Sequence, residues 1–314
     1  DARDQAAFFE RLGLSHGGID EADDSGKRAR LYRALVYLEH HFGSRVGVPE
    51  IARIACYTPR HFQRVFQETF GETVRSYVHR VRLQKAAQLL AFYEMPVLDV
   101  AQAVGYDGAS VFTRAFTAHH GCAPAAYREA RRAPPRFGAP NGASVHDAPL
   151  ALRFATFPTL RIVFIRHIGH PRGMLAVWLK LLAWAWKKGL LRGREALPLC
   201  LYHDGGECPP EQNRCDIAIT VPDDFDGGDS AVGVKDIPGG RVMMHDFKGA
   251  AAAIEARWHL LCDTWLPQSG WRLREEYSFD LFAPHQMSPR KLAAILTARD
   301  PVVESTLCVP VAAR

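Results

Sequence analysis

The chain has 314 residues, of which 47% are hydrophobic and 23% charged, an ordinary globular composition that excludes a largely disordered or collagen-like protein. The net charge of +5 is uneven, with −5 in residues 1–26, +9 in residues 27–136 and +1 in residues 137–314. Only the middle segment has the charge expected of a surface that meets nucleic acid, although a solvated basic surface is the alternative.

The length predicts two domains. Residues 133–149 are rich in proline and glycine, so we expect a linker between an all-α domain over 27–132 and an α+β domain over 150–314. Residues 1–26 form an acidic extension. The longest apolar stretch, 174–186, is shorter than the roughly 20 residues of a membrane span, and the seven cysteines are irregularly spaced. These features favour a cytoplasmic protein with no membrane contact and no disulfide framework.

The first domain has helical spacing of its apolar residues. Thr58 and Thr73 are typical N-caps, and Gly71 and Gly121 are typical helix ends. The pattern predicts helices over residues 31–42, 49–54, 59–70, 73–93, 97–104, 109–120 and 124–131.

This domain also contains an internal repeat. FQRVFQETFGETVRSY, which starts at Phe62, recurs as FTRAFTAHHGCAPAAY from Phe112, with five identical residues at an offset of 50. Each copy reads as a short helix, a tight turn and a second helix. This is the helix-turn-helix pattern, whose second helix can enter the major groove of DNA. We therefore predict a double helix-turn-helix domain.

The second helix of each copy has one polar face. Its residues lie at positions i, i+3 and i+4, and the buried phenylalanines lie opposite. Arginine can bind guanine and glutamine can bind adenine through two hydrogen bonds each. Exposed polar residues of a helical bundle are the alternative, but the duplication and the basic charge favour DNA. The predicted DNA-binding residues are Arg60, Gln63, Arg64, Ser110, Thr113 and Arg114.

The helix predicted over 73–93 joins the two copies. Its length of about 30 Å would place the two reading helices about one duplex turn apart. Its basic side chains are predicted to contact phosphates, which adds affinity but little sequence information. These residues are Arg75, Arg80, Arg82 and Lys85.

The segments IARIACYTPRHFQRVF, RLQKAAQLL, VLDVAQAVGYDGASVFTRAF and GCAPAAYR make residues 28–131 resemble the AraC/XylS family of bacterial transcription regulators. The resemblance implies that five of the six predicted residues, all but Thr113, read double-stranded DNA. RNA polymerase is a further candidate partner. The chain departs from the family at Cys56, where a small turn residue such as glycine is commoner. The small Ser110 also differs, which puts base readout there in doubt.

The second domain repeats with a period of 80. Arg161, Gly169, Trp178 and Leu201 recur as Arg241, Gly249, Trp258 and Leu281. Each copy reads as strand, helix, strand, strand, which predicts a pseudo-symmetric pair with a cleft between the copies. The predicted elements cover 161–168, 174–187, 199–203 and 216–221, and then 241–247, 250–266, 277–282 and 306–311.

The segments GGRVMMHDFKG, EARWHLLCDTWLPQSGW, SFDLF and LCVPV make residues 150–313 resemble the GyrI-like effector domain. The resemblance implies that an amphipathic organic molecule binds in the cleft between the repeats. Members of that family often have glutamate at the position of Asp280. The shorter side chain of Asp280 keeps this charge.

The residues themselves favour a similar site. Asp280 shares a strand face with Phe282, and the repeat places Tyr202 at the matching position. A carboxylate between aromatic rings suits a lipophilic cation. Trp258, at a matched repeat position, is the fourth predicted ligand residue. A solvated Asp280 at a sheet edge, and a core role for Trp258, are the alternatives.

The sequence contains no nucleophile elbow, P-loop or dinucleotide fingerprint, so we predict no catalytic residue, no cofactor and no enzyme. His203, Cys208, Cys215 and His245 fit no standard zinc spacing, so we predict no metal. The leading function is a DNA-binding transcription regulator that senses a small organic effector. The alternatives are a regulator with a C-terminal protein-contact module and, less favoured, a hydrolase of a reactive small molecule.

Overall fold

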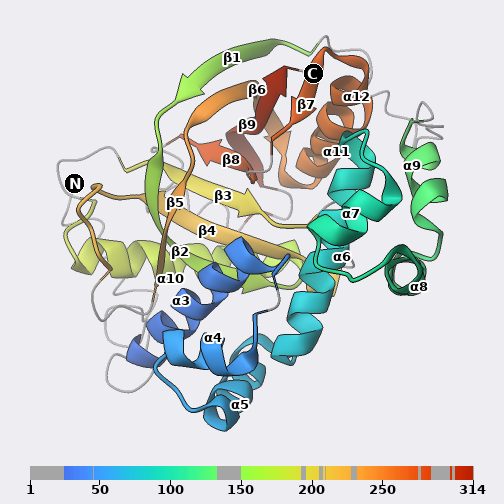
Figure 1. Cartoon of the computed structure of the whole chain (residues 1–314). Coiled ribbons are helices and arrows are strands. Elements are labelled where there is room, and N and C mark those ends of the chain that lie inside the picture. The colour runs from blue at the N-terminus through green and yellow to red at the C-terminus, as the bar shows by residue number, and fades with distance from the viewer. Residues whose placement is uncertain are drawn as a thin grey trace. The chain divides into compact units, whose positions relative to one another are not determined.

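The computed structural model describes residues 25–44, 46–132, 150–191, 196–204, 208, 210–227, 232–274, 277–283, 298 and 301–313. The chain divides into two compact units (Figure 1). We call Arg30–Gly138 with Cys262–Arg272 the helical unit, and Asp1–Ala29, Ala139–Leu261 and Leu273–Arg314 the sheet unit. The predicted linker and nearly all of the acidic extension lie outside the described residues, so the expected domain boundaries stay a prediction.

The first part of the chain is helical, as predicted. The helices are α3 (Ser25–His41), α4 (Val48–Ile54), α5 (Pro59–Phe70), α6 (Val74–Phe92), α7 (Val97–Ala103), α8 (Ala109–His120) and α9 (Pro124–Arg132). Thr58 is the N-cap of α5, because its hydroxyl accepts a hydrogen bond from the His61 amide. Thr73 caps α6 in the same way. Left-handed glycines, Gly71 and Gly121, end α5 and α8.

The 50-residue repeat is visible in the packing of aromatic rings. Phe62 and Phe66 are buried with ring centroids 5.6 Å apart, and Phe112 and Phe116 repeat this at 5.5 Å. In each copy the second phenylalanine then meets a tyrosine edge to face, at 5.6 Å in the first and 5.4 Å in the second. The two motifs therefore have equivalent aromatic cores.

The turns of the two motifs differ at one residue. Gly105 has a φ of 81°, and Cys56, at the matching position, has a φ of 55°. Cys56 is the only described residue other than glycine with a positive φ. A side chain in this left-handed conformation costs about 1–2 kcal/mol relative to glycine. The departure from the family noted at Cys56 therefore corresponds to real backbone strain.

The rest of the chain forms one antiparallel sheet with helices. The strands are β1 (Leu152–Phe157), β2 (Leu160–Ile168), β3 (Pro198–Tyr202), β4 (Arg214–Thr220), β5 (Gly233–Ile237), β6 (Gly240–Ala250), β7 (Trp271–Leu273), β8 (Ser278–Phe282) and β9 (Val302–Ala313). Their order is β1-β6-β9-β8-β3-β4-β2-β5, and β7 pairs with β9. The predicted fold class, a double helix-turn-helix domain followed by a duplicated α+β domain, is confirmed.

The strand order reads the same from both ends when the two repeats are exchanged. β1 pairs with β6 of the second repeat, and β5 pairs with β2 of the first. The registers match as well, because Phe157 faces Gly240 and, 80 residues on, Ile237 faces Leu160. The sequence analysis missed β1 and β5. Through β1 and β5, each repeat contributes a strand that pairs with the other repeat.

The helices of the two repeats differ. In the first repeat α10 (Met174–Lys187) covers β2 and β4 and shares an apolar core with them (Figure 1). In the second repeat the predicted single helix is divided into α11 (Ile254–His259), a π-helical turn (Leu260–Trp265) and α12 (Leu266–Gln268). The period of the apolar residues predicted the helix but not its π turn, which begins at Leu260, two residues after Trp258.

Candidate functional site

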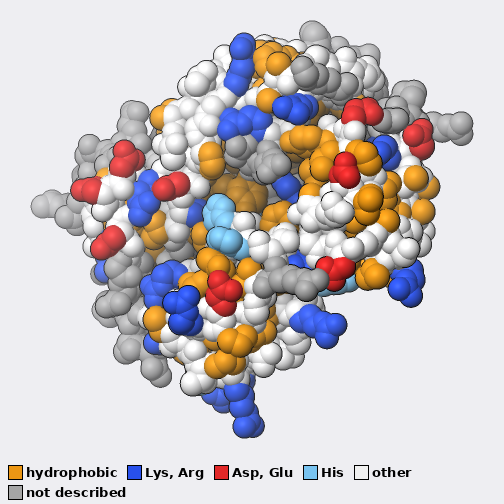
Figure 2. Space-filling model, viewed as in Figure 1, with side chains coloured by type: hydrophobic (Ala, Val, Ile, Leu, Met, Phe, Trp, Pro, Cys, Tyr) orange, Lys and Arg blue, Asp and Glu red, His pale blue; other side chains and the backbone are white. Residues whose placement is uncertain are grey.

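The outward face of α5 is polar, as predicted. Arg60, Gln63 and Arg64 are exposed, while the phenylalanines of the same helix are buried. Figure 2 shows Lys and Arg side chains projecting over the end of the molecule that α5 occupies in Figure 1. The side chain of Arg64 is 66% exposed and lies 3.9 Å from Glu68, a weak surface pair. Its guanidinium is therefore available to an external partner.

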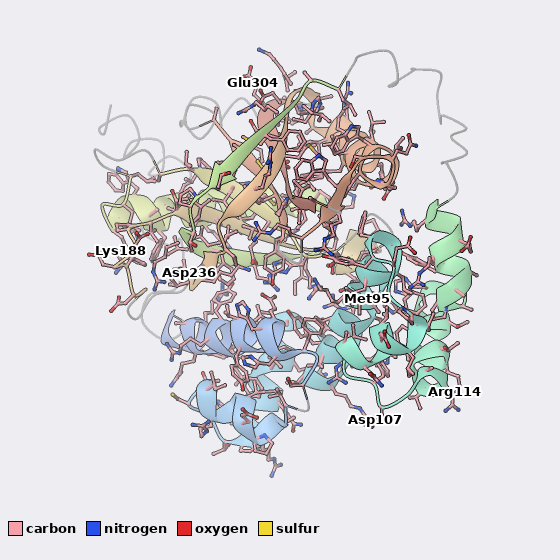
Figure 3. All side chains as sticks on the ribbon, turned by 45° about the horizontal axis from the view of Figure 1, so that its top comes forward. Met95, Asp107, Arg114, Lys188, Asp236 and Glu304 are labelled. Carbon is pink, nitrogen blue, oxygen red and sulfur yellow. The ribbon has the colours of Figure 1, made fainter. Side chains whose placement is uncertain are left out.

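The outward face of α8 differs in part from the prediction. Ser110 and Arg114 are exposed, and Figure 3 shows Arg114 pointing away from α8 toward the outside. Thr113 is only half-exposed, because it lies at the edge of the buried face. Val111, which the sequence analysis did not single out, is 51% exposed.

Two of the four predicted phosphate contacts do not fit their positions on α6. Arg75 is exposed and Lys85 is half-buried, and their phosphate contacts stay predictions. Arg80, however, is 7% exposed, and its guanidinium pairs with Glu72 and lies 5.4 Å from the ring of Tyr77. A side chain held in this way inside the unit cannot extend to a phosphate.

Arg82 is also a structural residue. Its guanidinium donates to three backbone carbonyls, those of Phe42 at 2.7 Å, Gly105 at 2.9 Å and Ser44 at 2.9 Å. The end of α3 and the turn of the second helix-turn-helix are thereby joined to α6. The correction for Arg82 is the same as for Arg80, because its hydrogen-bond donors are already used within the unit.

The predicted ligand residues lie in the middle of the sheet unit. Asp280 is fully buried on β8, next to β3 at the centre of the sheet, so the alternative of a solvated edge residue is wrong. The hydroxyl of Tyr202 donates a hydrogen bond to Asp280 Oδ2 at 2.5 Å. The ring of Tyr202 meets Trp258 edge to face, with centroids 5.6 Å apart. The structure therefore brings three of the four predicted residues together.

The fourth residue belongs to the symmetric counterpart of this group. Phe282, 80 residues after Tyr202, meets Trp178, 80 residues before Trp258, also edge to face at 5.6 Å. Each tryptophan thus contacts the aromatic strand residue of the other repeat. Phe282 shares the strand face of Asp280 but has no hydroxyl, so only one side of the arrangement has a hydrogen bond to the carboxylate.

The electrostatics of Asp280 are unusual for a carboxyl group. Burial raises the pKa of Asp280 to about 7, although the side chains of Tyr202 and Trp258 both act in the opposite direction. Asp280 Oδ1 and the indole nitrogen of Trp258 are both buried, and neither makes a hydrogen bond within the described part of the chain. Buried polar atoms normally have partners, so this pair of atoms is unusual.

A second buried carboxylate was missed from the sequence. Asp216 on β4 is fully buried and pairs with Arg166, with Lys235 Nζ at 2.6 Å and with His203 Nε2 at 2.8 Å. Burial acts to raise the pKa of Asp216, but Arg166, Lys235 and the contact with His203 hold this pKa well below its ordinary range. Asp216 faces Leu201, and Asp280 faces Cys200, so the two carboxylates lie on opposite faces of the sheet. The only sequence signal was a carboxylate within an otherwise apolar strand.

Comparisons with known proteins cover both halves. Residues 51–130 match a helix-turn-helix domain family, and residues 151–293 match a family described as the GyrI-like small molecule binding domain. The right origin-binding protein of Escherichia coli (strain K12) is 34% identical over 94 residues, which are 30% of this chain and 32% of that protein. The chain thus matches about a third of that relative's length.

A shorter relative is matched over most of its length. The HTH-type transcriptional activator AarP of Providencia stuartii is 33% identical over 94 residues, which are 30% of this chain and 70% of AarP. A solved AraC-type transcriptional regulator from Chromobacterium violaceum is 23% identical, with 34% of this chain and 95% of that chain covered and a TM-score of 0.32.

Among the residues that the structure describes, no helix has the length and apolar character to cross a membrane.

Proposed function

Because the chain belongs to the AraC/XylS family of helix-turn-helix regulators and carries a GyrI-like domain, we propose that it is a transcription regulator whose DNA binding is controlled by a small molecule. The reading surfaces are the outward faces of α5 and α8, and the effector binds beside Asp280. The relatives are bacterial regulators, so the proposal places the protein with the DNA, in the cytoplasm. RNA polymerase remains a predicted partner.

The observation that supports DNA binding is the repetition of one surface. α5 and α8 carry an exposed arginine at the same position, Arg64 and Arg114, above equivalent aromatic cores. α6 joins the two motifs over 19 residues, about 28 Å at 1.5 Å per residue. One turn of duplex DNA is about 34 Å long, so two reading helices joined by such a spacer suit consecutive major-groove segments.

The observation that supports an effector is the buried, incompletely bonded group around Asp280. An unpaired carboxylate in an apolar interior is unfavourable, and the raised pKa of Asp280 expresses this. A lipophilic cation would supply the charge partner that Asp280 lacks. The rings of Tyr202 and Trp258 would add aromatic contacts to it. Such a ligand would bind Asp280 in its ionised form.

The experiment is a titration of the full chain with duplex DNA, with and without an effector. A fluorescent duplex selected from a randomised pool reports DNA binding by anisotropy at several salt concentrations. The proposal expects affinity to fall steeply as salt rises, and to change when a lipophilic cation is added. Sequence-independent binding that Arg64→Ala and Arg114→Ala leave unchanged would contradict the DNA part. Tight cation binding that leaves DNA affinity unchanged would contradict the proposed regulation of DNA binding by the effector.

A further inference from the structure

The repeat places Val111 at the position that His61 occupies on α5. Both side chains are exposed in the first turn of their helices, between Arg60 and Arg64 on α5 and between Ser110 and Arg114 on α8. His61 stacks on Tyr57 of its own motif, with ring centroids 4.9 Å apart. Val111 instead presents an isopropyl group to solvent, half exposed at 51%.

Helix geometry puts Val111 on the reading face. At about 100° per residue, Val111 lies about 60° from Arg114 around the helix, whereas Thr113 lies about 100° away. The observed exposures follow this, because Val111 is exposed and Thr113 is only partly so. Any surface that receives Arg114 therefore also meets Val111, one helical turn nearer the start of α8.

An apolar group at this place has a specific partner in DNA. In the major groove, thymine is the base that presents a methyl group, and apolar side chains contact it. Val111 and Arg114 are separated by about 4.5 Å along the helix axis, close to the 3.4 Å rise of one base pair. Val111 can thus lie over the base pair beside the one that Arg114 contacts.

We propose that Val111 is a specificity residue that reads the C5-methyl group of a thymine, in the half-site that α8 occupies. This rests on the proposed DNA binding and adds the base class that α8 selects. His61, which stacks on Tyr57, takes the matched position on α5, so this methyl contact belongs to the half-site of α8 alone.

The test removes the thymine methyl group from the DNA and replaces the isopropyl group of Val111 with the methyl group of alanine. The full chain is titrated with its pool-selected duplex, in which each thymine in turn is replaced by uracil, which lacks only the methyl group. One replacement should weaken binding about fourfold, the factor for burying one methyl-sized group. Val111→Ala should weaken binding to the thymine duplex by a similar factor and abolish the difference between thymine and uracil at that position.

Matched variants keep the result interpretable. Alanine favours helix more than valine, so Val111→Ala preserves α8. Val111→Ile, which keeps the apolar branch, should retain the preference for thymine. Val302→Ala makes the same substitution at a residue of β9 that is 60% exposed and should change nothing.

The outcomes separate two failures. A chain that selects no duplex from the pool would overturn the proposed function and this inference with it. A chain that binds its duplex tightly but ignores every uracil replacement would overturn the role of Val111 alone. Persistence of the thymine preference in Val111→Ala would have the same meaning.

Discussion

Cys200 and Asp280 occupy the same position in the two repeats and face each other across the central strand pair of the sheet. The pseudo-twofold axis of the sheet unit therefore passes between a thiol and a carboxyl group. On either side of this pair lie the equivalent aromatic contacts, Tyr202 with Trp258 and Phe282 with Trp178. The scaffold is symmetric, but its chemistry is not, and the carboxylate and the hydroxyl lie on one side. This asymmetry favours one effector molecule per domain in one orientation.

Cation affinity should depend on pH through Asp280. Its pKa is about 7, so below pH 7 a cation must displace a proton, and affinity should rise about tenfold per pH unit before levelling off above pH 7. A neutral isostere should show no such dependence. Calorimetry of the full chain with a matched cation and neutral ligand, from pH 5 to 9, measures this. If Asp280→Asn keeps both the pH dependence and the cation preference, Asp280 is not the partner.

Tyr202 should tune that dependence. Its hydrogen bond lowers the pKa of Asp280, so Tyr202→Phe should raise this pKa further. The midpoint of the cation affinity profile should then move to higher pH, while the ring still packs against Trp258. Phe282→Leu, on the symmetric side, should leave the midpoint in place. A midpoint unchanged in Tyr202→Phe would show that the hydroxyl does not act on the carboxylate.

Asp280 should also reduce stability at high pH. Its pKa rises from 3.8 in the unfolded chain to about 7 in the folded one, so the folded state binds the extra proton between these values. The contribution of Asp280 to the free energy of unfolding is therefore greatest below about pH 4. It falls as pH rises from about 4 to about 7 and stays low above pH 7. Asp280→Asn should remove the slope and stabilise the protein at pH 8 by about 4 kcal/mol at most. Urea unfolding at several pH values tests this, with the half-exposed Asp236→Asn as the control.

Arg64 and Arg75 should affect DNA binding differently. Arg64→Ala should cost about 1–3 kcal/mol and relax the preference at one base pair, since a base contact carries sequence information. Arg75→Ala should weaken all sequences alike and reduce the slope of log affinity against log salt by about 1. Anisotropy on a panel of single-site duplex variants separates the two. Equal, sequence-independent losses would make Arg64 a phosphate contact.

Arg82 should matter for stability. Arg82→Ala leaves the carbonyls of Phe42, Ser44 and Gly105 without their donor, which should lower the free energy of unfolding by about 2–4 kcal/mol. Lys85→Ala, one turn further along α6, should change it by far less. Thermal unfolding followed by circular dichroism gives both values. A stable Arg82→Ala variant with weakened DNA binding would restore the phosphate role first predicted.

The two turns should respond in opposite directions. Cys56→Gly removes a side chain from a left-handed residue and should stabilise the protein by about 1 kcal/mol. Gly105→Ala adds a Cβ 2.6 Å from the Gly43 carbonyl oxygen and 2.8 Å from the Arg82 guanidinium, so it should be strongly destabilising. Comparison of the two melting temperatures with the parent chain checks both signs.

Local signals predicted the local structure well. Thr73 and Gly121, a cap and a left-handed end, placed α6 and α8 within a residue of their observed ends. Arg80 was misplaced because α6 has polar residues all round, and nothing in its spacing shows that Tyr77 and Arg80 share the buried side. Val111 was not singled out, because only the polar residues of the outward face were considered.

Long-range pairing could not be predicted in the same way. That Tyr202 and Trp258 would approach Asp280 followed from the repeat, but the depth of Asp280 did not. It depends on β8 lying at the centre of the sheet, which results from pairing between strands far apart in sequence. Burial of the carboxyl group, and with it the raised pKa, is a property of that strand order.

The place of β9 has a consequence for how the protein is made. β9 is the last of the described strands along the chain, yet it lies between β6 and β8 in the sheet. During synthesis, β6 and β8 therefore emerge with open edges that only residues 302–313 can fill, and such edges invite aggregation. A premature stop codon shortly before Val302 should abolish the ligand-binding half altogether instead of shortening it.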